Sequence, residues 1–96
     1  MVKHIVCFKL GDNSPEKCLE AKNVLMSMVG KVPTALDINV GIDFLHSDRS
    51  CDIILEVTLK DRNALEEYQN DAYHCEKVKP YMHSVRTASY SVDYEF

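Results

Sequence analysis

A phenol and an imidazole lie close together in the C-terminal half of the chain and are suited to proton transfer. The stretch from Leu65 to His83, LEEYQNDAYHCEKVKPYMH, contains Tyr68 and His74. A neutral imidazole can take up a proton near neutral pH, and a phenol can donate a hydrogen bond to an oxygen on which negative charge develops. Their spacing is not a helical repeat. We therefore expect that a bend between them is needed to bring both side chains to one pocket.

The other three histidines have simpler interpretations. His4 occurs in a row of apolar residues, and we interpret it as a core histidine that is hydrogen-bonded to a neighbour, with a functional role as the alternative. His46 occurs in a polar loop, where we expect it to be solvated. His83 is expected at a helix end, where a cation is favoured.

The four cysteines do not indicate a metal site or a disulfide framework. They show no CxxC pair and no zinc-finger spacing; they are Cys7, Cys18, Cys51 and Cys75. We interpret them as reduced thiols that serve as small apolar residues. We expect no metal and no organic cofactor.

Length and charge restrict the class of protein. The chain has 96 residues, so we expect one domain, residues 1–96. Eleven basic and fifteen acidic residues give a formal charge of −4, which argues against binding to nucleic acid or to an anionic membrane surface. No apolar run is long enough for a membrane span. The opening MVKHIVCFKL alternates apolar and charged residues, so we interpret it as a strand rather than a signal peptide and expect a cytoplasmic protein.

The elements that must position these side chains follow from hydropathy patterns. Alternation with a period of two predicts four strands, namely Val2–Leu10, Ala35–Leu45, Cys51–Lys60 and Val85–Phe96. Gly41, within the second strand, indicates a bulge or a close backbone approach.

Two helical regions lie between these strands. Ser14 and Pro15 open the first helix as a cap and a first-turn proline. The second helix begins near Arg62, after a capping Asp61. Because Asn70 and Asp71 favour a local turn over helix interior, we expect a kink or break there.

The element order predicts a ferredoxin-like α+β fold. The elements follow the order strand, helix, strand, strand, helix pair, strand. This βαββαβ order predicts a four-stranded antiparallel sheet with helices on one face. The other face is also apolar, and the last strand presents a long aromatic row that includes Tyr90, Tyr94 and Phe96. A second copy of the sheet can cover this face, so we expect a symmetric homodimer that closes through its sheet faces.

Four short motifs, in the right order over the whole chain, resemble the stress-responsive A/B barrel (Dabb) family. They are Val2–Leu10 (VKHIVCFKL), Leu65–Gln69 (LEEYQ), His74 followed by Val78, and Val92–Tyr94 (VDY). The resemblance implies a ferredoxin-like monomer and a dimeric α/β barrel.

The resemblance also implies candidate site residues. Most members of the family have no assigned reaction, but plant members include a polyketide cyclase in which a tyrosine and a histidine act as an acid/base pair. These fall on Tyr68 and His74 here. The strand-one histidine of the family falls on His4, and Asp93 occupies the place of an aspartate near the same pocket. Where the family often has His-Pro-x-His, this chain has Asp-Ala-Tyr-His, ending at His74.

Three functions remain open, and the residues do not decide whether the chain is an enzyme. The first is a binding module that holds a small, partly apolar molecule in a pocket between sheet and helices. The second is a cofactor-free proton-transfer enzyme, with His74 as base, Tyr68 as hydrogen-bond donor, and His4 and Asp93 as supports. The third, a cofactor-independent monooxygenase, rests on fold analogy alone.

Overall fold

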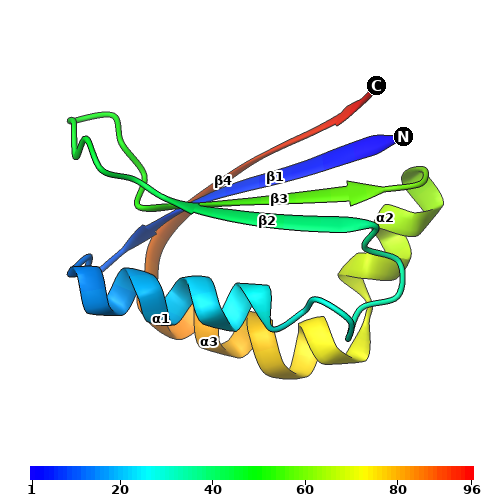
Figure 1. The fold of residues 1–96 in the computed structure, drawn as a ribbon, viewed down its shortest axis with the longest axis horizontal. Helices are drawn as coiled ribbons and strands as arrows, with labels where there is room; N and C mark the ends of the chain where they lie inside the picture. Colours follow the sequence, from blue (N-terminus) through cyan, green and yellow to red (C-terminus); the bar gives the residue numbers. More distant parts are fainter.

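The computed structural model describes residues 1–96 and has the predicted βαββαβ order (Figure 1). The strands are β1 (Val2–Leu10), β2 (Asp37–Ile42), β3 (Ile53–Leu59) and β4 (Arg86–Glu95). The helices are α1 (Pro15–Met26), α2 (Arg62–Gln69) and α3 (Lys79–Val85), and a π-helical segment, His74–Val78, joins directly to α3. No helix combines the length and the apolar character that crossing a membrane requires.

The four strands form one antiparallel sheet, and the helices lie on one of its faces (Figure 1). The strand order is β2-β3-β1-β4, so β1 is a central strand with partners on both sides. Its alternate residues are buried toward the helices. The predicted ferredoxin-like fold is confirmed.

The first helix forms where its capping signals predict it. The Ser14 hydroxyl accepts a hydrogen bond from the backbone N–H of Lys17, at 3.4 Å, and Pro15 occupies the first turn. One side of α1 and the turns after it is fully buried against the sheet; the buried residues are Cys18, Ala21, Leu25, Met28 and Val32. This apolar stripe fixes α1 over the sheet.

The second and third strands are shorter than predicted, because residues 43–52 form a loop. Gly41 does not form a bulge: it pairs with Ile54 in an uninterrupted register. A Cβ atom at Gly41 would lie 3.1 Å from the Cγ2 atom of Ile54, so the close neighbour of this glycine is a side chain and not the backbone that we expected. The register shift of the sheet occurs instead between Lys9 and Leu10, where β1 pairs with β4.

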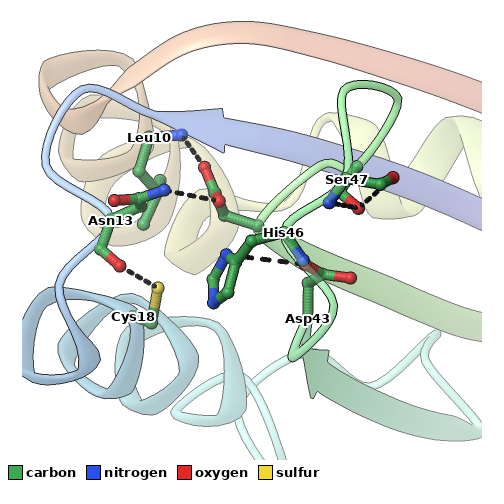
Figure 2. Close-up of polar contacts among 8 residues, drawn as sticks. Leu10, Asn13, Cys18, Asp43, His46 and Ser47 are labelled. Carbon is green, nitrogen blue, oxygen red and sulfur yellow. Dashed lines mark hydrogen bonds and ion pairs between the residues drawn. The ribbon is translucent and has the colours of Figure 1, made fainter.

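A buried carboxylate ties the 43–52 loop to the end of β1 (Figure 2). Asp52 accepts hydrogen bonds from the backbone N–H of Leu10, at 2.8 Å, and from the Asn13 amide, at 3.2 Å. His46 lies in the same loop with a left-handed backbone (φ 53°), and its imidazole is 3.6 Å from the Asp43 carboxylate. It is exposed, as predicted, and stands apart from the residues discussed below.

The sheet face that points away from the helices carries exposed apolar side chains. The predicted aromatic row of β4 lies here, and Tyr90, Val92, Tyr94 and Phe96 are 46–63% exposed. They neighbour Ile5 and Cys7 of β1, because Val92 pairs with Ile5 and Tyr90 with Cys7. We call this surface the outer sheet face.

Candidate functional site

His4 and Asp93 form a polar pair on the helix-facing side of the sheet. They are direct partners in the β1–β4 register. The Nδ1 atom of His4 is hydrogen-bonded to the Oδ1 atom of Asp93, and His4 is only 8% exposed. Because a carboxylate accepts hydrogen bonds, Nδ1 is the donor. The interpretation of His4 as a core histidine bonded to a neighbour is confirmed, and the neighbour is Asp93.

Tyr68 and His74 are brought together by the predicted break. The α2 helix ends at Gln69, and the carboxylate of Asp71 accepts a hydrogen bond from the backbone N–H of His74, at 3.2 Å. This local turn and the π-helical segment that begins at His74 reorient the chain. As a result the imidazole is stacked on the Tyr68 ring, with 4.5 Å between centroids and 26° between planes.

The position of His74 sets its tautomer. Its Nδ1 atom lies 3.2 Å from the backbone carbonyl oxygen of Tyr68. Since a carbonyl oxygen can only accept, Nδ1 carries the hydrogen and Nε2 presents a lone pair. Burial lowers the pKa of His74, and the nearby charge of Lys79 lowers it further. The imidazole is therefore held in its neutral form, which is the form that can accept a proton.

Tyr68 lies between the two imidazoles and is fully buried. The His4 ring meets it edge-on, with 5.6 Å between centroids. Its hydroxyl donates to the sulfur of Met28, at 3.7 Å. A thioether is a weak acceptor, so the phenol makes only a weak hydrogen bond here and would form a stronger one with an oxygen acceptor. Burial raises the pKa of Tyr68 well above its ordinary value, so the hydroxyl stays protonated.

A cavity of about 520 Å³ opens beside these rings, between the sheet and the α2–α3 region. His4, Tyr68 and His74 all contribute to its wall, whereas Asp93 stands behind His4 and does not line it. Half of the other lining residues are apolar, and they come from β1, α1, β3, the π-helical segment and α3; they are Val6, Phe8, Leu25, Leu55, Val78 and Met82. The other half are polar, namely Gln69, Asn70, Lys79, His83, Arg86 and Ser89. The cavity thus has an apolar part and several polar groups that converge on it.

Three basic residues of the cavity wall were not predicted from the sequence to lie at a site. Lys79, His83 and Arg86 line the cavity at the α3–β4 junction. His83 is in the last turn of α3, as predicted, but its place in the cavity was missed. The spacing of Lys79 and His83, one helical turn apart just before a strand, was the available signal.

The carboxylate and thiol groups do not create a metal centre. No group of three or more histidine, cysteine, aspartate or glutamate side chains is arranged to hold a metal ion. All four cysteines are free, and only Cys18 is buried. Asp93, which we expected to support the base His74, pairs with His4 and not with His74.

Solved structures resemble this fold over its whole length. A protein of Arabidopsis thaliana superposes with a TM-score of 0.86 at 22% identity, covering 100% of this chain and 95% of the other. A dimeric protein of unknown function from Bacteroides fragilis, with a ferredoxin-like fold, gives 0.81 at 26% identity, covering 99% and 95%. An antibiotic biosynthesis monooxygenase gives 0.73 at 17% identity, covering 100% and 98%.

The family assignment comes from the sequence as a whole. No curated protein sequence matches the chain. The family model of the stress responsive A/B barrel domain, Dabb, matches residues 2–96. That match spans β1 through β4, including the strand that carries His4 and the strand that carries Asp93. The chain is therefore a member of the stress responsive A/B barrel domain family.

Proposed function

We propose that the cavity beside Tyr68 and His74 binds a small, partly apolar molecule. The observation that carries this proposal is the convergence of three ring side chains on one cavity: His4 from β1, and Tyr68 and His74 from the C-terminal half of the chain. Its volume of about 520 Å³ lies within the range of small-molecule sites, roughly 300–1,000 Å³. The apolar side chains of the wall favour a molecule with a hydrophobic part, and the ring nitrogens offer polar contacts that orient it.

A thermal-shift screen tests this proposal. A compound that binds the folded protein raises its melting temperature in a concentration-dependent way. Ser89 lines the cavity, whereas Ser91, two residues along the same strand, does not, and both are exposed. Ser89→Tyr should block the cavity and abolish the shift, while Ser91→Tyr should preserve it. A shift that persists unchanged in Ser89→Tyr would locate the ligand elsewhere and reject the proposal.

A second candidate function is cofactor-free proton transfer on a small carbonyl compound. The observation that favours it is the neutral His74, whose Nε2 lone pair is left free by the bond from Nδ1 to the Tyr68 carbonyl. In this proposal His74 is the base, and the Tyr68 hydroxyl exchanges its weak contact with Met28 for the oxygen of the substrate. The His4–Asp93 pair supports Tyr68 from the sheet side.

Deuterium exchange tests this second function without knowledge of the natural substrate. The α-protons of a simple aryl ketone, acetophenone, exchange slowly in D₂O, and NMR follows the exchange. A base in the cavity should accelerate it, and His74→Gln should remove the acceleration while His46→Gln, in the exposed loop, keeps it. Equal acceleration by His74→Gln would reject the role of His74. The monooxygenase alternative has only the shared fold in its support.

We also propose that two copies assemble through the outer sheet face into a dimeric α/β barrel. Solved structures with this fold from Bacteroides fragilis and Thermobifida fusca are dimeric. The exposed row of Tyr90, Val92, Tyr94 and Phe96 provides an apolar surface for such a contact. A small domain buries little surface alone, so pairing of the sheets adds to its core.

A further inference from the structure

The charge of the cavity wall is opposite to that of the protein. The chain carries 15 acidic and 11 basic residues. None of the 15 residues that line the cavity is acidic. Five of them have basic side chains, namely His4, His74, Lys79, His83 and Arg86. Three of the four histidines of the chain are among these five.

Arg86 has no acidic partner, although it is only partly exposed. It is the first residue of β4 and lines the cavity together with Ser89. The ion pairs of the protein are formed by other residues, and Arg62 is the arginine that pairs with a carboxylate. An anion that is hydrogen-bonded to a guanidinium stabilises its charge where the guanidinium is partly removed from water. The planar guanidinium can bond two oxygens of a carboxylate or phosphate at once.

Lys79 and His83 extend the same positive region. They lie one turn apart on α3, the helix that ends directly before Arg86. The Lys79 ammonium donates to the backbone carbonyl of Gln69, at 3.1 Å, and also makes no ion pair. Lys79 lines the same cavity as His74, the proposed base. The charges of Lys79 and Arg86 thus lie on the part of the cavity wall that α3 and the start of β4 form.

We infer that the ligand of this cavity is an organic anion, whose carboxylate or phosphate contacts Arg86, Lys79 and His83. Its apolar body would then lie against Val6 and Phe8 of β1, toward the stacked rings. This inference rests on the proposed binding function and narrows it to a class of molecule. A neutral ligand of the same shape leaves the Arg86 guanidinium without a partner and therefore binds less tightly.

Matched probes test the inference by calorimetric titration at low salt. The probes are 3-phenylpropanoic acid, its primary amide, which has the same shape without the charge, and phenyl phosphate. The variants are Arg86→Gln and Lys79→Gln, with Lys77→Gln as the control, because Lys77 is a nearby lysine that does not line the cavity. Lys79 is partly exposed and its ammonium bonds only a backbone carbonyl, so its substitution provides a second test if Arg86→Gln folds poorly.

We expect an anionic probe to bind wild-type protein about tenfold or more tightly than the amide, by analogy with charged hydrogen bonds. Arg86→Gln and Lys79→Gln should each remove most of that difference, and Lys77→Gln should not. Tighter binding of 3-phenylpropanoic acid or of phenyl phosphate shows whether the cavity prefers a carboxylate or a phosphate. Equal binding of acid and amide overturns the anion inference and leaves the binding function intact. Binding of none of the probes counts against the binding function itself.

Discussion

The imidazole of His74 is stacked on the ring of Tyr68, although their sequence spacing would place them on different faces of a continuous helix. The turn at Asp71 and the π-helical segment after it change the direction of the chain between them. The same arrangement bonds Nδ1 of His74 to the carbonyl oxygen of Tyr68. One local break therefore sets the position, the tautomer and the burial of the imidazole.

The first prediction concerns how stability depends on pH. The pKa of His74 is lowered in the folded protein by burial and by Lys79, whereas the unfolded chain has an ordinary value of about 6.5. Between these two values the unfolded state binds more protons, so the contribution of His74 to stability is present above about pH 6.5 and is lost as pH falls toward the lowered pKa.

Urea unfolding at about pH 7.5 and about pH 5.5 measures this effect. His74→Gln should lose less free energy of unfolding than wild type between these two pH values. His46→Gln, in the exposed loop, should behave like wild type. Protein concentration must be constant, because assembly stabilises the folded state. An identical pH response in His74→Gln and wild type would contradict the prediction.

The second prediction concerns the pair formed by His4 and Asp93. Asp93→Ala leaves the buried Nδ1 hydrogen of His4 without its acceptor. Loss of a partner for a buried donor costs about 1–2 kcal/mol of unfolding free energy. Glu95→Ala is the matched control two residues along the same strand, because its ion pair with Arg62 is fully exposed and should contribute little. An equal loss of unfolding free energy in the two variants would show that burial of His4 does not increase the contribution of the His4–Asp93 pair to stability.

The third prediction separates the ring of Tyr68 from its hydroxyl. Tyr68→Ala removes a fully buried aromatic ring from the core and should cost about 3–5 kcal/mol. Tyr68→Phe removes only a weak hydrogen bond to the Met28 sulfur and should cost no more than about 1 kcal/mol. Chemical denaturation measures both. If the hydroxyl serves a substrate, Tyr68→Phe should slow ketone exchange while the protein remains folded. A loss of several kcal/mol in Tyr68→Phe would mean that the hydroxyl is structural.

Much of the fold could be predicted because its signals are local. Alternation along Val2–Leu10 identifies a strand with one buried row, and Ser14-Pro15 marks the start of α1. Asn70 and Asp71 likewise predict the break that positions His74. These features depend on side chains acting on their own backbone, so they can be identified without tertiary information.

The full set of site residues could not be predicted, because residues far apart in the sequence form the site and local patterns do not indicate such contacts. Asp93 meets His4 because of the β1–β4 register, across 89 positions of the chain. The π-helical segment buries His74 and Val78, and a polar motif alone does not predict that geometry. Arg86 reaches the cavity because β4 begins directly after α3.

The last prediction concerns assembly through the outer sheet face. Val92 is 61% exposed and pairs with Ile5, whose other neighbour in the sheet is Glu56. Val92→Glu adds a second carboxylate to this apolar row, so two copies brought face to face would bury unpaired like charges. Sedimentation velocity should show a dimer for wild type and a monomer for Val92→Glu. Leu19→Glu is the control, since Leu19 is 52% exposed on α1, on the helix side. A dimer that survives Val92→Glu but not Leu19→Glu would assign assembly to the helical face, and the barrel would be rejected.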